Sequence, residues 1–549
     1  MGNVREKARA VFSSVKRRLP GKADSTKLLL AAVFLALVFI PIIVMFTNID
    51  SESIKAVVNS HNFGESIKNS IVSSTIATVI TIVIAYALAV CLERINIRFR
   101  NIFTIILMLP MLTPSISNGM GLVLLFGNNG ILTKLFGIEG NIYGLSGIVM
   151  GSVLYAFPVA FLMFSDVIRY EDSSPYEAAD VLGLSKLHKF KAITFPYLRK
   201  PLISVIFATF TLIITDYGVP LMVGGKYVTL PVVMYQEVIG QLNFGKGAVY
   251  GSILLLPAVI AFVIDLLNKD KGNSSFVIKP HQRSNGRLQK AFSYVGCTAV
   301  CVFVILPIAT FVMLAFSKDY PNELAITFDN FLKAEKLRAF EYLSNSVLIA
   351  FVTATIGVMI AFMAAYLSAR MKSKVSRFLH LSAITSAAIP GIVLGLAYVL
   401  TFKGTAIYGT LLILIMVNMI HFMSSPYLMI YNTLSKINEN IEPVAHTMGI
   451  NRLHMIKDIF VPQCIGTMLE MFSYFFVNCM MTISAVSFLA TTSTKPISLM
   501  INQFEAQMQL ECAAVVSLLI LGVNLLVKGV FHIAKNVYKN KKINAKEMR

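Results

Sequence analysis

Apolar and polar residues alternate in long blocks along this 549-residue chain. The apolar blocks recur at a length of roughly 20 residues, which crosses a bilayer as one α-helix. The pattern predicts an all-α polytopic membrane protein with about 12 transmembrane helices. We place these spans approximately at 28–47, 67–92, 102–126, 145–168, 200–222, 248–267, 290–316, 343–369, 378–402, 407–430, 464–490 and 511–534.

The second half of the chain repeats the first. At a shift of 276 positions, the matching pairs include Asn69-Ser70 with Asn345-Ser346, Arg94 with Arg370, and Pro114 with Pro390. Further along, the shift falls to 266, and the pairs are Ala179 with Ala445, Gly183 with Gly449, His188 with His454, and Pro196 with Pro462. Each half has six spans, so the two halves are expected to be parallel repeats with a pathway between them.

The repeat divides the chain into five segments. These are a basic N-terminus (1–27), a first six-span repeat (28–267), a polar linker (268–289), a second six-span repeat (290–534) and a basic tail (535–549).

The distribution of charge supports this arrangement. Charged residues make up 14% of the chain, against about 25% in ordinary soluble domains. A net charge of +20 on a soluble chain would suggest a nucleic-acid partner. Here roughly three quarters of the 48 Lys and Arg residues lie in the termini, the linker and the loops after even-numbered spans. Because Lys and Arg stay on the inner side, we expect both termini and the linker in the cytoplasm and no nucleic-acid partner.

Two polar loops on this inner side have the same layout. We call residues 173–196 the first repeat loop and residues 438–462 the second repeat loop. In the first, Ser174 is expected to cap a short helix, Glu177 to complete a capping box, and Gly183 to end the helix in a left-handed cap. A second short helix, capped by Ser185, should then end before Pro196.

The small side chains of Ala178 and Ala179 would let another backbone approach the first of these helices closely. Two such helices at constant spacing, on one side of the membrane, indicate a pair of projections that fit sockets on a partner protein. The alternative is an ordinary interfacial helix that lies on the membrane lipid.

The first repeat loop resembles the EAA loop of type I ABC importer permeases: Glu177, Ala178 and Ala179 are followed by Gly183 at the family's spacing. The second copy departs from the motif. Glu442 stands one place early, Pro443-Val444-Ala445 replaces Glu-Ala-Ala, and Gly449 is kept.

The resemblance implies the type I ABC permease fold in the inner or plasma membrane of a prokaryote. It also implies that the two loops are coupling helices seated in two copies of a cytoplasmic ABC ATPase subunit, and that a substrate-binding protein docks on the outer side. Fused chains of this kind resemble permeases for ferric iron, thiamine, polyamines and 2-aminoethylphosphonate. "MTISAVSFL" and "KPISLMI" look closest to the iron and aminoethylphosphonate group.

The chain lacks the motifs of a catalyst. No GxxxxGK[ST] phosphate loop is present, so ATP hydrolysis is expected in separate subunits and this chain is not expected to be an enzyme. No spacing of His and Cys suits a metal, and the six cysteines fall in or beside apolar spans. We therefore expect no catalytic residue, no metal site and no cofactor in this chain.

Asp216 is the main polar candidate inside a span. A carboxylate near the bilayer centre costs about 2.5–3.5 kcal/mol, so it should face protein or water. It could belong, with Tyr217, to the translocation pathway, or it could be a structural ion pair or a protonated, hydrogen-bonded group. Gly218 and Pro220 suggest a broken helix at this point. Thr482 stands at the matching position of the second half.

Two other functions remain open. A secondary transporter of two six-helix halves, driven by an ion gradient, would need an intramembrane carboxylate relay. A membrane scaffold that recruits a cytoplasmic partner would explain the two loops but not the duplicated core.

Overall fold

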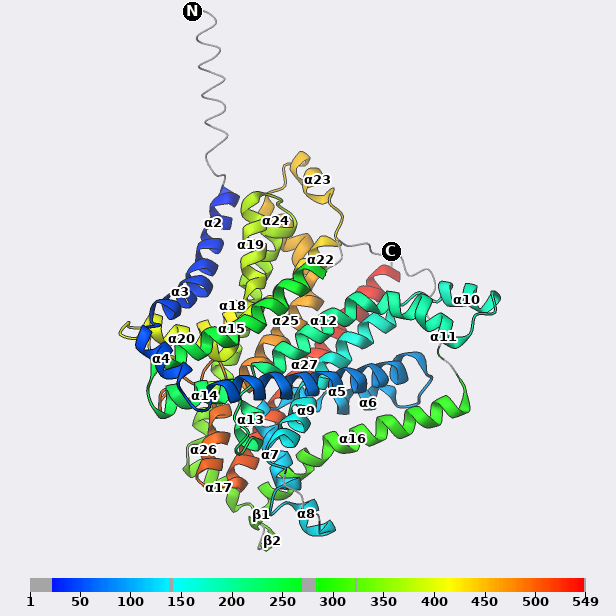
Figure 1. Ribbon diagram of the computed structural model, residues 1–549. Helices are drawn as coiled ribbons and strands as arrows, with labels where there is room; N and C mark the ends of the chain where they lie inside the picture. The colour runs from blue at the N-terminus through cyan, green and yellow to red at the C-terminus, as the bar shows by residue number, and fades with distance from the viewer. Residues whose placement is uncertain (1–21, 138–141, 269–282, 284, 321–322, 548–549) are drawn as a thin grey trace, which may run out of the picture.

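The computed structural model describes residues 22–137, 142–268, 283, 285–320 and 323–547, and Figure 1 shows them as a bundle of helices with one small hairpin. Of the five segments expected from the sequence, the N-terminus falls mostly outside the described residues, as does the linker. The basic tail is not a separate segment, because the last helix continues through it to Glu547.

The first half contains eighteen elements in the described residues. In order they are α2 (Lys22–Phe34), η1 (Leu35–Phe39), α3 (Ile40–Thr47), α4 (Ser51–Val58), α5 (Phe63–Arg94), α6 (Arg100–Leu107), η2 (Leu109–Leu112), α7 (Ser115–Phe126), α8 (Ile131–Phe136), α9 (Leu145–Arg169), α10 (Ser174–Val181), α11 (Lys186–Lys189), η3 (Phe190–Thr194), α12 (Phe195–Ile214), α13 (Gly218–Val223), α14 (Leu230–Tyr235), η4 (Gln236–Gly240) and α15 (Phe244–Asn268).

The second half follows the same plan with one added hairpin. Its elements are α16 (Arg287–Ala315), β1 (Ser317–Asp319), β2 (Glu323–Ile326), α17 (Asp329–Lys336), α18 (Ala339–Ala369), α19 (Lys374–Thr385), η5 (Ser386–Ala388), α20 (Gly391–Phe402), α21 (Leu411–His421), α22 (Ser424–Ser435), α23 (Ile441–Thr447), α24 (Arg452–Met455), η6 (Ile456–Phe460), α25 (Val461–Met481), η7 (Ile497–Leu499), α26 (Met500–Ala506) and α27 (Leu510–Glu547). The two strands pair antiparallel, with Ser317 opposite Ile326.

Among the described residues, ten helices are long and apolar enough to cross a bilayer, and the number rises to twelve if each of two bent helix pairs is one span. The predicted all-α membrane architecture is therefore confirmed. A single continuous helix over 102–126 was wrong, because the chain breaks at η2 and restarts after Pro114. In the second half, α19 and α20 meet at 109° beside the matching Pro390.

The first helix of each repeat lies against the opposite half. α2 and α3 pack on α19 and α20, where the Lys27 Nζ donates to the carbonyl of Met371 at 3.0 Å. α16 packs on α5, α6 and α7, and its Tyr294 hydroxyl accepts from the N–H of Arg98 at 2.8 Å. The two halves are thus interlocked through the first helix of each repeat.

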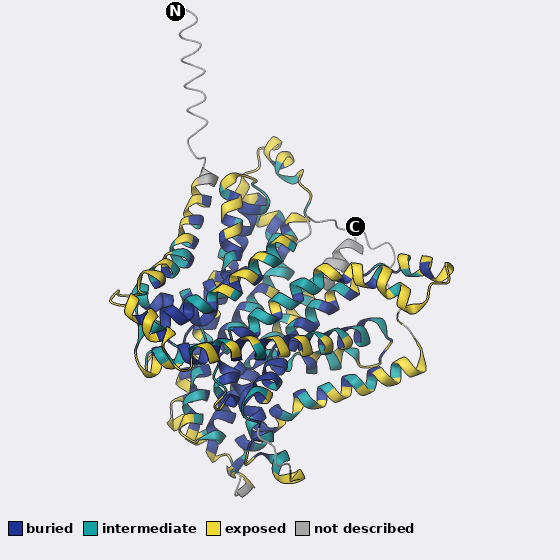
Figure 2. Cartoon of the chain, in the orientation of Figure 1, coloured by how far each residue is buried: buried dark blue, intermediate teal, exposed yellow. Residues whose placement is uncertain are grey.

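Helix α5 shows why an apolar sequence folds this way. Its buried face carries small and hydroxylated residues, namely Ser70, Ser73, Ser74, Ala77 and Thr78, and its exposed face carries Ile71, Ile76, Val79 and Val83. Large apolar side chains lose nothing against lipid, whereas small residues allow close helix packing inside. Figure 2 shows the same division, with buried residues gathered where helices meet.

The repeated Asn-Ser pair has one structural role in both halves. In the first half, Asn69 donates to the carbonyl of Val228 at 3.1 Å, and Ser70 accepts from the N–H of Leu230 at 2.7 Å. In the second, Asn345 donates to the Ser493 carbonyl at 3.0 Å and Ser346 accepts from the N–H of Ile497 at 2.8 Å. Each pair therefore fixes the irregular segment that follows the broken fifth span of its half.

Candidate functional site

The two repeat loops project from the body as separate lobes. In Figure 1, α23 stands at the top, α10 at the right, and the end of α27 between them, while β1, β2 and α8 lie at the opposite, lower end. Both loops thus lie away from the end that holds β1, β2 and α8, and the side of the membrane that they face stays a prediction.

Helix α10 begins one residue earlier than the sequence predicted. Its N-cap is Ser173, and the Asp172 carboxylate accepts from both the N–H and the hydroxyl of Ser174. The predicted capping box from Ser174 to Glu177 was therefore wrong. Glu177 instead accepts a hydrogen bond from the Ser173 hydroxyl at 3.3 Å. Asp172 takes this role because its carboxylate reaches the first helical N–H group, that of Ser174, directly.

Both helices end in the same six-residue cap. Gly183 and Gly449 have φ of +67° and +70°. Their N–H groups bond to the carbonyls of Asp180 and His446, and the next N–H groups bond to the carbonyls of Ala179 and Ala445. This is the Schellman pattern, and it turns the chain sharply after each short helix. Gly183 thus ends its helix in the left-handed conformation, as its position predicts.

The second short helix of each loop does not stop before the proline. Ser185 caps α11 by accepting from the N–H of His188, but α11 then runs through η3 into α12, with Pro196 in the first turn of α12. The wider π turn, together with the first-turn position of a residue that lacks an N–H, lets the helix continue. In the second loop Asn451 occupies the N-cap of α24 without a side-chain cap bond.

The outward faces of the loops are more apolar than the alanines suggested. Ala179 and Ala445 are buried, while Ala178 is exposed. Large apolar side chains also face outward: Val181, Leu182 and Leu187 in the first loop, and Val444, Met448 and Leu453 in the second. Exposed apolar groups of this kind mark surfaces that another protein or the membrane covers.

An arginine at the end of a span holds the first repeat loop from inside. Arg94, the last residue of α5, forms an ion pair with Glu171, whose side chain is 3% exposed. The Tyr176 hydroxyl donates to Glu171 at 2.5 Å and lies 2.8 Å from the hydroxyl of Thr194. Burial, and next the bond to Glu171, raise the pKa of Tyr176 to about 12, so the phenol keeps its proton. This network joins α5, α10 and η3.

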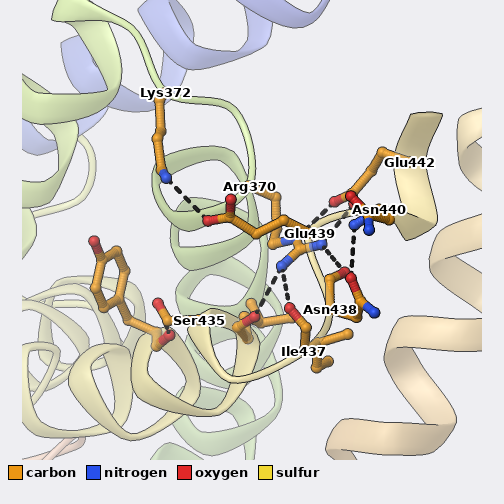
Figure 3. Close-up of polar contacts among 10 residues, drawn as sticks. Arg370, Lys372, Ser435, Ile437, Asn438, Glu439, Asn440 and Glu442 are labelled. Carbon is orange, nitrogen blue, oxygen red and sulfur yellow. Dashed lines mark hydrogen bonds and ion pairs between the residues drawn. The ribbon is translucent and has the colours of Figure 1, made fainter. Parts of the chain in front are cut away.

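The second repeat loop has a matching arginine (Figure 3). Arg370 follows α18 and forms a two-pronged ion pair with Glu442, at 2.6 Å from Nε and 2.5 Å from Nη2. It also donates to the carbonyls of Ile437 and Asn438, at 2.6 and 2.7 Å. Its guanidinium lies over the ring of Phe460. The bond to Glu442 raises the pKa of Arg370. The equivalence of Arg94 and Arg370 was visible in the sequence, but their partners were not.

Asp216 lies in the break between α12 and α13. Its carboxylate accepts from the Ser115 hydroxyl at 2.6 Å, from the N–H of Gly218 at 3.3 Å and from the N–H of Val219 at 3.0 Å. The expected broken helix is present, and the carboxylate caps its second part. A small cavity beside it is lined by Ser70, Ser73, Ser74, Ile148, Ser152, Ile213, Ile214, Asp216, Pro220 and Thr229. All of these residues belong to the first half.

Tyr217, in contrast, joins the two halves. Its hydroxyl lies 2.5 Å from the Ser487 hydroxyl, and its ring stacks on Tyr235 with centroids 4.8 Å apart. Tyr235 in turn accepts from the Asn502 amide at 3.3 Å. These contacts close the space between the halves at the level of the helix break.

Thr482 is buried at the end of α25 and hydrogen bonds within its own half, where its carbonyl accepts from Ser498 at 2.8 Å. The structure therefore brings Tyr217 to the interface between halves, while Asp216 and Thr482 each serve a helix end. Within the described residues, no group of three or more His, Cys, Asp and Glu side chains could hold a metal ion.

Comparison with known proteins gives one family. The family model described as binding-protein-dependent transport system inner membrane component matches residues 82–317 and 357–535.

Several curated relatives are transport permeases. The Ferric transport system permease protein FbpB of Actinobacillus pleuropneumoniae is 24% identical over 426 residues, which cover 74% of this chain and 62% of that protein. The Putative ferric transport system permease protein FbpB 1 of Haemophilus influenzae is 24% identical over 74% of this chain and 67% of its own. The Thiamine transport system permease protein ThiP of Haemophilus influenzae is 26% identical over 54% of this chain and 55% of its own length. The match thus spans less than two thirds of the first of these relatives.

Proposed function

Because this chain belongs to the family of binding-protein-dependent transport system inner membrane components, we propose that it is the fused permease of an ATP-driven ABC importer. Its two halves form the pathway for a small polar solute. Two copies of a separate cytoplasmic ATPase subunit hydrolyse ATP, and an extracytoplasmic binding protein delivers the solute. Both termini, and the ATPases, lie on the cytoplasmic side.

The observation that carries the proposal is the pair of repeat loops. Two short helices, α10 and α23, end in the same Schellman cap, and each loop shows exposed apolar residues. The helix that follows each cap, α11 or α24, runs directly into a span through a π turn. A partner that moves these loops apart or together would therefore move the spans as rigid levers. The EAA-type residues Glu177, Ala178, Ala179 and Gly183, with Ala445 and Gly449, form the coupling sites of this proposal.

The Tyr217–Ser487 contact is proposed as the gate of the pathway. It lies between the halves, beside the broken helix, where a change in the angle between halves would separate its two hydroxyl groups. For cargo, the ferric permease relatives favour iron(III), and 2-aminoethylphosphonate is the second solute class we propose.

Capture of the ATPase tests the coupling role. Leu182→Glu should abolish co-purification of the ATPase subunit encoded in the same genome, because it places a charge on a surface residue that is 75% exposed and that docking would bury. Leu332→Glu, at a 55% exposed leucine on α17 at the opposite end, is the matched control and should capture normally. Unchanged capture by Leu182→Glu would reject the coupling surface.

Transport tests the whole proposal. Liposomes that contain this chain, the ATPase and internal ATP should accumulate iron(III) or 2-aminoethylphosphonate delivered by the binding protein. Accumulation by the chain alone under an ion gradient would contradict it.

A further inference from the structure

The inner anchor of each repeat loop uses the same three kinds of side chain in different places. Both anchors contain an arginine at the end of the second span of its half, α5 or α18, a carboxylate and an aromatic ring over the guanidinium. In the first half the carboxylate is Glu171, before α10, and the ring is Tyr176, on α10. In the second half the carboxylate is Glu442, on α23, and the ring is Phe460, on η6.

The repeat shift of 266 positions makes this exchange explicit. Glu171, Tyr176 and Thr194 of the first half correspond to Ile437, Glu442 and Phe460 of the second. In the second half the carboxylate therefore stands at the position of Tyr176, and the aromatic ring stands at the position of Thr194. Both sets nevertheless surround an arginine at the equivalent position of its half. The side chains of Arg94 and Arg370 are largely covered, at 20% and 3% exposed.

The exchange changes the role of Glu442. The sequence alone places Glu442 beside the EAA position, as a displaced copy of Glu177. In the structure its carboxylate points inward and both of its oxygens bind Arg370. Pro443 stands at the position of Glu177, and His446 stands at the position of Asp180.

The outward faces of α10 and α23 therefore differ in charge. Helix α10 presents the exposed Glu177 and Asp180, and Asp180 pairs with Lys189, whereas α23 presents Pro443, Val444 and His446. A protein that docks on α10 meets the Glu177 carboxylate and the Asp180–Lys189 ion pair, and one that docks on α23 meets apolar groups and an imidazole.

We propose that Arg94 and Arg370 are positioning residues that clamp each repeat loop to the inner end of the second span of its half, α5 or α18, and that Glu442 serves this clamp and not the docking surface. The part of the proposal that concerns docking rests on the proposed function. The clamp itself is a property of this chain alone.

The mechanical consequence follows from what each arginine joins. Arg370 holds the end of α18, the turn after α22, helix α23 and the ring on η6 at one point. A displacement of α23 is thereby passed to α18 and α25 together. Without the clamp, α23 would be held chiefly by Ala445 and its Schellman cap, and it could move without moving the spans.

Amide hydrogen exchange of the purified chain, without any partner, tests the clamp. Glu442→Gln and Glu442→Tyr should each speed exchange in residues 441–447 by at least tenfold. The matched control is Glu439→Gln, which removes the Glu439–Lys372 ion pair in the same loop, where both side chains are more than three quarters exposed at 76% and 78%. It should leave exchange unchanged.

A rescue experiment separates positioning from general stability. The triple variant Ile437→Glu, Glu442→Tyr, Phe460→Thr builds the first-half arrangement around Arg370. It should return exchange in residues 441–447 to within threefold of the wild type, while Glu442→Tyr alone does not. Failure of the triple variant to recover, with folded protein by thermal melting, would overturn the proposed equivalence of the two clamps.

Co-purification of the ATPase tests the part of the proposal that concerns docking. If Glu442 serves only the clamp, the triple variant should capture the ATPase like the wild type although it lacks a carboxylate at 442. Loss of capture in the triple variant with normal exchange would show that Glu442 is a docking residue and overturn the assignment. If the wild type itself captures no ATPase, the proposed function fails, and the exchange data still decide the clamp.

Discussion

Replacing either cap glycine by alanine should loosen one repeat loop without touching the rest of the molecule. Gly183 and Gly449 have φ of +67° and +70°, and no heavy atom lies within 4 Å of the position that a Cβ would occupy at either site. The substitution therefore causes no clash. Its whole cost is the left-handed backbone, which is roughly 1–2 kcal/mol for an L-residue with a side chain.

That cost sets the expected size of the effect. About 1–2 kcal/mol corresponds to a factor of about 5–30 in the equilibrium between the capped and the opened loop. The reporters are the N–H groups of Leu184 and Ile450, which bond to the carbonyls of Ala179 and Ala445 across each cap. Exchange at Leu184 should rise by that factor in Gly183→Ala, and exchange at Ile450 should rise equally in Gly449→Ala.

Two controls make the measurement specific. Asn tolerates the left-handed region better than other residues, so Gly183→Asn should have a smaller effect than Gly183→Ala. Gly466 lies inside α25, also with no neighbour within 4 Å, and lacks a positive φ. Gly466→Ala should not speed exchange, because alanine is the better helix former by about 1 kcal/mol.

The result that would refute the reasoning is plain. If exchange at Leu184 in Gly183→Ala stays within twofold of the wild type, the left-handed cap does not hold the loop. In that case the turn between α10 and α11 must be fixed by the packing of Ala179 alone.

Three further predictions concern the interior. Asp216→Asn should lower the melting temperature and uptake together, because it puts an amide where the N–H of Val219 needs an acceptor, at about 1–3 kcal/mol; normal stability with lost uptake would point to a pathway role instead. Tyr217→Phe should raise the rate of ATP hydrolysis by the assembled transporter in the absence of solute, since it removes a hydrogen bond between the halves worth about 1 kcal/mol. An unchanged basal rate of hydrolysis would exclude the proposed gate. Lys27→Ala, which loses the bond to the Met371 carbonyl, should make α2 sensitive to protease in the intact chain, and a protected α2 would contradict the anchoring role.

The repeat was the most informative feature of the sequence. It matched Asn69-Ser70 with Asn345-Ser346, and in the structure both pairs hold the segment after a broken span by the same kind of hydrogen bonds. It also marked Arg94 and Arg370 as equivalent. What they bind could not be read from the repeat, because the carboxylate and the ring occupy different positions in the two halves.

Errors in the sequence interpretation were local and came from competition between neighbouring groups. The sequence favours Ser174 as the N-cap of α10, and only the path of the chain after α9 decides that Ser173 takes that place and that the Asp172 carboxylate accepts from the N–H of Ser174. Pro196 was read as a helix end, yet a π turn before it carries α11 into α12 without a break. Such choices depend on a few ångströms of backbone position that no residue pattern records.

The amino-acid sequence by itself determined that this chain is a doubled bundle of membrane helices, with two capped loops on one side, because hydrophobic length, charge placement and left-handed glycines act locally. Only the tertiary structure decided which helix packs on which half, that Glu442 pairs with Arg370, and that Asp216 caps a helix while Tyr217 spans the two halves. Those outcomes depend on side chains that are distant in sequence meeting in a buried space, where an unpaired charge is costly and one partner must be found.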